Sequence, residues 1–174
     1  MPTMQTIDIT AMPEVLKGKI VAEEDRLDFW PTMFHSHIME AMEFERMIFI
    51  TAERQTSDYQ SGYWEFVILD AEQKIYYIYP LEGKNLTVNG IMNHSTSVMS
   101  PELFGLLTTM LCLAWRGDAT GDPRYHEAYR KLYAFTQKKL HEVYLPYDDV
   151  PESEWPEEVA QAANTLSIIH RFLD

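Results

Sequence analysis

The sequence predicts an α+β protein in which a small antiparallel sheet is covered by helices in a two-layer arrangement. One observation is a pair of neighbouring segments, residues 62–69 and 74–81, that are rich in aromatic and β-branched side chains. The other is a second half in which helix-start signals recur. Helices that are grouped away from a hairpin, and do not alternate with single strands, are typical of the α+β class. With 174 residues, 46% of them hydrophobic, we expect residues 1–174 to form one domain with a substantial core.

The first third of the chain is predicted to hold a lead-in and one long helix. Residues 1–20 are the lead-in, with room for one extended piece. Pro31 interrupts an aromatic segment at 26–34 and biases Trp30 away from the helical conformation. Over residues 38–52 apolar side chains recur near a helical period, which predicts a helix, although the run "MIFIT" within it also fits a strand.

A β-hairpin is predicted next. Residues 70–73 join the two aromatic segments, and a connection of this length suits two antiparallel strands. Residues 85–90 (NLTVNG) are expected to add a short third strand, and residues 93–97 (NHSTS) are expected to form a loop.

Start and stop signals predict helices in the second half. Ser100 suits an N-cap and Pro101 the first helical position, and Gly117 offers a stop. Asp122 and Pro123 repeat the same start signal for a second helix, whose lysines crowd its end.

The chain then carries an acidic, proline-rich stretch before its last helix. Residues 146–158 contain three prolines and six acids and no base, which predicts a solvated acidic connection. Residues 157–173 are predicted to form the last helix.

The formal charge of −13, from 27 acids and 14 bases, limits the class of partner. No basic cluster is longer than Lys138-Lys139, so direct nucleic-acid binding is not expected. A protein partner or a role that opposes DNA binding fits better, and plain solubility is the alternative explanation. The N-terminus lacks the pattern of a secretory signal, and no apolar run approaches the roughly 20 residues that cross a bilayer. We therefore expect a cytoplasmic protein without membrane contact, whose oligomeric state the sequence leaves open.

No motif in the sequence predicts a cofactor or a metal, and none points to catalysis. The 7 glycines are scattered and form no phosphate-binding loop. His35 and His37 share a side only in an extended segment, and no nearby Cys or His completes a metal site. A nucleophile turn of the G-x-S-x-G type is absent from the sequence. The single cysteine, Cys112, lies in an apolar run, so we expect a buried small hydrophobe and not a reactive thiol.

Glu65 is a carboxylate inside an otherwise apolar strand. Side chains alternate along a strand, so Glu65 shares a mixed face with Val67, while Trp64 and Phe66 share the apolar face that suits the core. A buried carboxylate with a raised pKa is a candidate acid catalyst. No second acid of the hairpin stands at a spacing that suits two-carboxylate chemistry. The sequence favours a structural or partly exposed Glu65, with a partner contact and catalysis together with a histidine as the alternatives.

Six segments of the chain carry a resemblance to a known family. They are "EEDRLDFWPTMF" (23–34), "DYQSGYWEFVIL" (58–69), "YYIYP" (76–80), "MSPELFGLLTTML" (99–111), "YHEAYRKLYAF" (125–135) and "SIIHRFLD" (167–174). In this order they resemble the plasmid-borne ArdB/KlcA family of antirestriction proteins. The D-F-W-P and D-Y-x-x-G-Y-W-E-F motifs are the most specific, and we interpret their residues mainly as structural: Phe29, Trp30, Pro31, Asp58, Tyr59, Gly62, Trp64, Glu65 and Phe66.

The chain departs from the family pattern in four places. The family usually has glycine where this chain has His35, a Gly-Gly pair where it has Ser61-Gly62, and an Asn-Gly-Gly turn where it has "DAEQK". The region 138–160 is also longer. The resemblance implies an inhibitor of bacterial type I DNA restriction that protects incoming unmodified plasmid or phage DNA. It implies no catalysis and no cofactor, and a restriction enzyme subunit or an associated host protein is the partner that we expect.

DNA mimicry is the alternative that the acidity suggests. Duplex DNA carries one charge per about 1.7 Å, so a decoy of roughly 20 base pairs would present roughly 40 phosphates. This chain has 27 acids, offset by 14 bases and spread along its whole length. A short decoy at the acidic stretch remains as an alternative to a solvated connection, and its candidate residues are Asp148, Asp149, Glu152, Glu154, Glu157 and Glu158.

Overall fold

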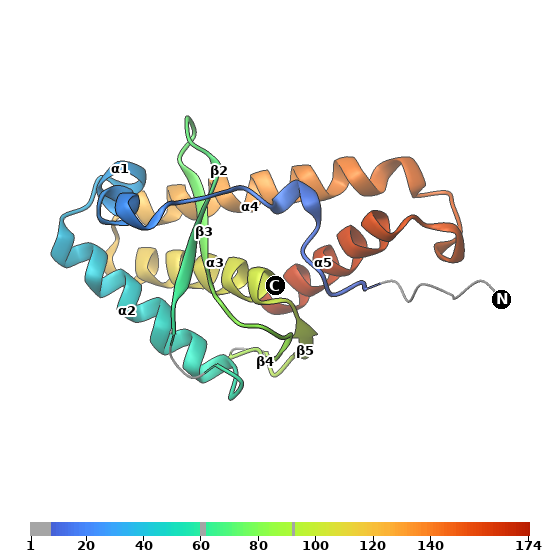
Figure 1. The fold of residues 1–174 in the computed structure, drawn as a ribbon, viewed down its shortest axis with the longest axis horizontal. Helices are drawn as coiled ribbons and strands as arrows, with labels where there is room; N and C mark the ends of the chain where they lie inside the picture. The colour runs from blue at the N-terminus through green and yellow to red at the C-terminus, as the bar shows by residue number, and fades with distance from the viewer. Residues whose placement is uncertain (1–7, 60–61, 92) are drawn as a thin grey trace.

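The structure, a computed structural model, describes residues 8–59, 62–91 and 93–174 of the chain. Its elements, with η for a 3-10 helix, follow in the order η1 (Glu14–Leu16), β1 (Lys19–Ile20), η2 (Glu23–Asp28), α1 (Phe29–Phe34), α2 (Ile38–Gln55), β2 (Trp64–Asp70), β3 (Ile75–Pro80), β4 (Leu86–Asn89), β5 (Thr96–Met99), α3 (Pro101–Thr120), α4 (Pro123–Tyr144), η3 (Leu145–Tyr147), η4 (Glu152–Glu154) and α5 (Glu157–Leu173). Two small antiparallel sheets pack with the helices, and Figure 1 shows the β2–β3 hairpin crossing α3 and α4. The architecture is α+β, as the sequence predicts.

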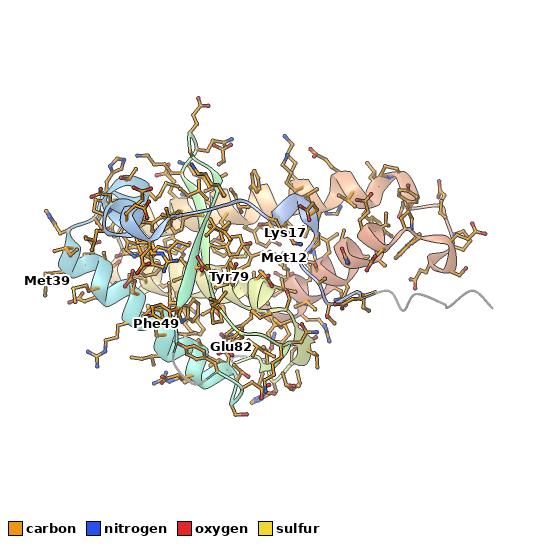
Figure 2. All side chains as sticks on the ribbon, viewed as in Figure 1. Met12, Lys17, Met39, Phe49, Tyr79 and Glu82 are labelled. Atoms are coloured by element: carbon orange, nitrogen blue, oxygen red, sulfur yellow. The ribbon has the colours of Figure 1, made fainter. Side chains whose placement is uncertain are left out.

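The hairpin is covered on both faces, whereas one covered face was expected. Trp64 and Phe66 pack on aromatic residues of α1 and α2. The neighbouring β3 is buried along its whole length, and the hydroxyl of Tyr77 donates to the carbonyl oxygen of Leu16 at 3.0 Å. The segment expected to be a lead-in thus contributes Leu16 and Met12 to the core. Met12 of this segment is labelled in Figure 2.

Both outer edges of the hairpin are occupied. β1 pairs with β2, and just beyond it the N–H of Val21 donates to the carbonyl oxygen of Phe66 at 2.8 Å. On the other side α3 lies along β3, where the N–H of Ile78 donates to the hydroxyl of Thr109 at 3.2 Å. Unpaired strand edges invite pairing with other chains, and this fold closes both of them.

The expectation that residues 85–90 add a third strand to the hairpin is wrong. β4 pairs with β5 in a second sheet, so residues 93–97, expected as a loop, end in a strand. The physical reason is that β1 and α3 already occupy the hairpin edges. Near β4, the carboxylate of Asp58 accepts a hydrogen bond from the N–H of Thr87 at 2.9 Å.

Trp30 is helical, contrary to the expectation from Pro31. Pro31 is the third residue of α1, and the first four N–H groups of a helix have no partner within it, so a proline there costs little. His35 caps the end of α1 and has the left-handed conformation with φ 51°. Glycine adopts this conformation most easily, so a glycine would suit this position as well.

The long helices begin where the sequence predicts. The side chain of Ser100 accepts a hydrogen bond from the N–H of Leu103 at 3.3 Å, and that of Asp122 accepts one from the N–H of Arg124 at 3.0 Å. Both are N-caps of the expected type. α2 is a single helix, so the strand alternative for "MIFIT" is wrong.

Two glycines within α3 and the glycine that caps its C-terminus have different roles. Gly121, with φ 68°, ends the helix, while Gly117, the predicted stop, lies within it. Gly105 permits close packing of α3 on β3. A Cβ atom at Gly105 would lie 2.2 Å from the Cβ of Tyr79 and 2.3 Å from the carbonyl oxygen of Ile78.

Candidate functional site

The aromatic residues of the two motif segments pack together in the core. The ring centroids of Phe29 and Phe66 are 4.9 Å apart, and the ring of Tyr76 lies 5.3 Å from Phe29 and 5.4 Å from Trp30. The indole N–H of Trp30 donates to a carboxylate oxygen of Glu45 at 2.5 Å, which satisfies its only polar group. These residues hold α1 against the hairpin as core side chains, since Phe29 and Trp30 are 3% and 4% exposed.

Asp58 and Tyr59 hold the second motif segment in place. Asp58 bonds to β4, as described above, and the hydroxyl of Tyr59 accepts a hydrogen bond from the indole N–H of Trp64 at 2.8 Å. Burial raises the pKa of Tyr59. Gly62 shows no comparable constraint, because a Cβ atom there would meet no atom within 4 Å.

Glu65 has an ionic partner that the sequence does not reveal. The Nη2 atom of Arg26 lies 2.8 Å from Oε2 of Glu65, and Nη1 donates to the carbonyl oxygen of Trp64 at 3.2 Å. The guanidinium also lies over the ring of Phe66, 5.5 Å from its centroid. The side chains of Arg26 and Glu65 are 24% and 19% exposed, so water screens this pair only in part. Arg26 belongs to the first motif segment, so the ion pair joins the two segments that are most specific in the sequence.

The environment of Glu65 does not assemble an acid–base site. General acid–base chemistry needs a second titratable group within hydrogen-bond reach of the reacting atoms. Within the described part of the chain, Glu65 contacts Arg26 and neither a histidine nor a second carboxylate. Its geometry supports the structural interpretation.

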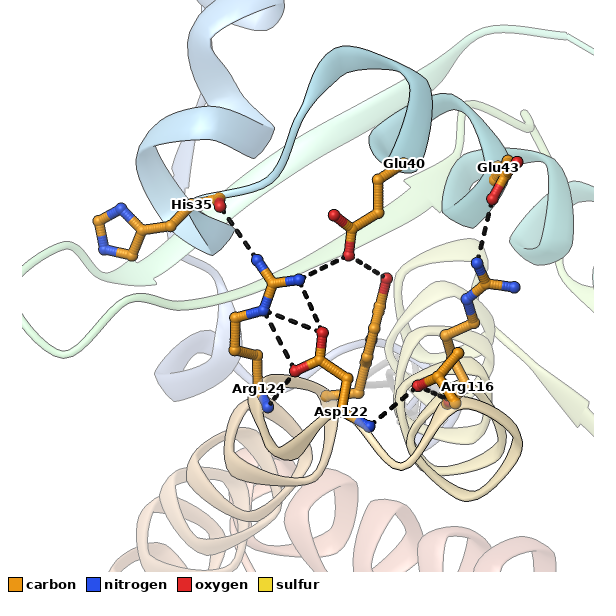
Figure 3. A network of polar contacts seen from close by, with 8 residues as sticks. His35, Glu40, Glu43, Arg116, Asp122 and Arg124 are labelled. Carbon is orange, nitrogen blue, oxygen red and sulfur yellow. Dashed lines mark hydrogen bonds and ion pairs between the residues drawn. The ribbon is translucent and has the colours of Figure 1, made fainter.

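A second polar cluster joins the start of α4 to the α1–α2 connection (Figure 3). Nη2 of Arg124 lies 2.8 Å from Oε1 of Glu40 and 2.7 Å from Oδ2 of Asp122. Nη1 of the same side chain donates to the carbonyl oxygen of His35 at 3.0 Å, and the hydroxyl of Tyr125 donates to Glu40 at 2.9 Å. The hydrogen bonds from Arg124 lower the pKa of Asp122. No sequence signal points to this cluster, because its members come from segments that are far apart in the chain. Arg124 and Glu40, for example, are separated by 84 residues.

The acidic stretch 146–158 folds around a tryptophan and turns its acids outward. The indole N–H of Trp155 lies 3.3 Å from the carbonyl oxygen of Tyr147 and 2.9 Å from that of Val150. All six acids are exposed, and no described lysine or arginine forms an ion pair with them: Asp148, Asp149, Glu152, Glu154, Glu157 and Glu158. The stretch can therefore offer an unneutralised negative surface.

The remaining candidates for chemistry are accounted for by their surroundings. Among the residues that the structure describes, no three His, Cys, Asp or Glu side chains gather to hold a metal ion. Cys112 is buried, as predicted, and burial raises the pKa of its thiol to about 12, so it is protonated at neutral pH. We find no stretch, in the helices that are described, with the length and apolarity needed to cross a membrane.

Comparison with known proteins gives matches to one family. The family model for antirestriction proteins matches residues 57–143, which is half of the chain. A curated relative, the antirestriction protein KlcA of Escherichia coli, is 28% identical over 123 residues. This alignment covers 66% of the present chain and 83% of the relative.

The fold is similar to a solved structure as well. That structure, described as showing a novel fold of the KlcA and ArdB proteins, matches with a TM-score of 0.61 and 22% sequence identity. The match covers 83% of this chain and 92% of the other, and the KlcA and ArdB proteins are described as active against type I DNA restriction systems in vivo but not in vitro. The matched residues 57–143 contain the second motif segment, the strands β2 to β5, helix α3 and most of α4. β1 lies outside them. The chain therefore belongs to the antirestriction protein family.

Proposed function

We propose that this protein inhibits bacterial type I DNA restriction and so protects incoming unmodified plasmid or phage DNA in the cytoplasm. The observation that carries the proposal is the family match over residues 57–143. The described activity of KlcA and ArdB against type I systems supplies the class of restriction enzyme.

Inhibition proceeds through protein contacts and without catalysis. The buried motif residues around Trp30 and Trp64 hold the fold, and among the described residues neither a histidine nor a second carboxylate contacts Glu65. For KlcA and ArdB, activity in vivo but not in vitro favours a partner that the living cell supplies. A restriction enzyme subunit in its cellular state, or a host protein associated with it, fits that requirement.

The proposal is tested by plating unmodified phage on a host with a type I restriction system, with and without this protein. We expect the plating efficiency to rise toward the value for modified phage, because restriction of the incoming DNA is relieved. Modified phage on the same hosts is the control and should plate equally well in both. An unchanged efficiency at good expression would remove this function.

A decoy that mimics DNA phosphates is the second candidate, and the exposure of the six acids in 146–158 is the observation that favours it. We still favour a solvated connection, because this stretch lies wholly outside the matched residues 57–143. Converting all six acids to Asn or Gln distinguishes the two. We expect the neutral variant to fold and to protect incoming DNA as the wild type does.

A matched control removes the same charge elsewhere on the surface. It neutralises six exposed acids outside the stretch, Glu23, Glu24, Asp25, Glu53, Glu72 and Glu142. Loss of protection in the first variant alone, with both proteins folded, would establish the decoy. In that case binding to purified restriction enzyme should also weaken with salt, because salt screens exposed charges.

Replacing Glu65 by glutamine tests the structural role of that residue. The amide oxygen can still accept a hydrogen bond from Arg26, so we expect the free energy of unfolding to fall by only about 1 kcal/mol. Protection in the plating assay should persist. Glu65→Leu, which removes the acceptor, should destabilise more in the same denaturant titration. Protection lost in a Glu65→Gln protein of unaltered melting temperature would assign Glu65 to a partner contact or to catalysis.

A further inference from the structure

Folding gathers four of the 14 basic residues at one groove. All four belong to α4, as two adjacent pairs: Arg130 and Lys131, and Lys138 and Lys139 about two helical turns later. Both pairs line a groove of about 530 Å³ between α4 and the β2–β3 hairpin, whose turn projects past α4 (Figure 1). A volume of this size is within the range of protein binding sites, about 300–1,000 Å³.

Most of this positive charge is not neutralised by the protein. Lys131 forms an ion pair with Glu127 at 3.2 Å on the surface of the helix. No such pair is formed by Arg130, Lys138 or Lys139 with any residue of the described chain. The lining holds these four cations and two carboxylates, Asp70 and Glu127, so the groove keeps a net positive charge that favours an anionic ligand.

The groove also offers apolar surface. Ile75 of β3 is buried and Phe135 of α4 is half-buried, and both line it. Nζ of Lys139 lies 5.5 Å from the centroid of the Phe135 ring, so a positive charge stands directly beside an apolar surface in this groove. The lining carboxylate of Asp70 already accepts hydrogen bonds from the backbone and side chain of Gln73, at 2.8 and 3.1 Å.

We propose that this groove binds an acidic segment of a partner protein, with carboxylates on the α4 cations and an apolar side chain against Phe135. The inference rests on the proposed antirestriction function and names the chemistry of the partner surface. A peptide segment fits better than a nucleic acid. Duplex DNA carries a charge about every 1.7 Å over its whole length. A duplex would extend beyond the four cations onto the acidic remainder of the protein surface, which repels phosphates. A short peptide segment can instead be confined to the groove.

The binding test uses a fluorescein-labelled peptide in which pairs of glutamates alternate with single leucines, titrated with the full-length protein. We expect saturable binding that weakens with added salt, because the cations are exposed. The charge-reversal variant Arg130→Glu/Lys138→Glu should lose at least about tenfold in affinity, since each reversal replaces an attraction by a repulsion. Both residues are exposed on α4, so the variant should remain folded.

The matched control is Arg54→Glu/Lys84→Glu, which changes the net charge by the same amount. Arg54 lies in the last turn of α2 and Lys84 precedes β4, both remote from the hairpin turn, and both side chains are exposed. This variant should bind the peptide as the wild type does. Equal affinity in all three proteins, no binding at all, or tighter binding of a DNA duplex than of the peptide would each overturn the inference.

Plating assays with the same variants connect the groove to function. Loss of protection in Arg130→Glu/Lys138→Glu, with protection kept in the control, would support the inference. Protection kept in both variants would overturn it while the antirestriction function stands. If the wild type itself gave no protection, the proposed function would fail, and the peptide titration would still decide whether the groove binds acidic segments.

Discussion

Replacing Trp64 by alanine is expected to lower the free energy of unfolding by about 3–5 kcal/mol, the usual cost of losing a large aromatic side chain from a core. Trp64 is 4% exposed, and its ring packs on Phe49 at 5.2 Å and on Tyr59 at 5.5 Å. Its loss leaves a cavity and also removes the donor to the Tyr59 hydroxyl. Denaturant unfolding followed by circular dichroism measures the change.

Two further variants test why Trp64→Ala loses stability. Tyr63, the neighbour of Trp64, is 78% exposed, so Tyr63→Ala should change the stability by no more than about 0.5 kcal/mol. Trp64→Phe keeps a ring but loses the N–H, so its stability should lie between those of the wild type and Trp64→Ala. A soluble Trp64→Ala protein of normal stability would show that Trp64 is an exposed binding platform and not a core residue.

Gly105→Ala is expected to destabilise the protein by about 3 kcal/mol or more, at the upper end of the costs of overpacking. The added Cβ would lie 2.2–2.3 Å from atoms of Ile78 and Tyr79, two of which belong to the β3 backbone. A backbone cannot move aside as a side-chain end can. α3 must therefore shift away from β3, and the hydrogen bond between Thr109 and Ile78 is lost with it.

Gly117→Ala is the matched control on the same helix. The added Cβ would lie 2.8 Å from the imidazole of His126, whose Nε2 lies 3.2 Å from Oδ1 of Asp118. Both side chains are exposed at the surface, by 40% and 74%, so His126 can turn toward solvent at the cost of this one contact. Alanine is also a better helix former than glycine by up to about 1 kcal/mol. We expect Gly117→Ala to be nearly neutral in the same unfolding experiment. Equal losses in the two variants would show that helix geometry, and not the α3–β3 contact, sets the cost.

Local signals in the sequence predict most of the elements correctly. The hairpin follows from two aromatic segments with a short connection, and α3 and α4 follow from Ser100 and Asp122, because strand preference and helix capping depend on neighbours along the chain. Two of the errors occur where local rules compete. Pro31 disfavours a helix in general but is tolerated in a first turn, and Gly117 resembles a stop although Gly121 has the positive φ.

The candidate site could be predicted only in part, for a related reason. The motif segments around Trp30 and Trp64 are recognisable in the sequence, but the contacts that join them are not. Arg26 and Glu65 are 39 residues apart, and no rule of spacing predicts their ion pair. The sequence does not predict the basic groove, because two separate pairs of basic residues are too short to indicate a binding site. They line one groove only because the hairpin packs beside α4.

By itself, the sequence determined the α+β class, the hairpin, the starts of the long helices, the buried state of Cys112 and the family resemblance. These depend on composition, on side-chain periodicity and on hydrogen bonds between residues a few positions apart. The tertiary structure alone decided that β1, and not β4, completes the hairpin sheet, and that α3 closes its other edge. It also decided that Glu65 faces Arg26. The physical reason is that strand pairing, edge coverage and ion pairs between distant segments depend on which surfaces remain unoccupied once the helices have packed.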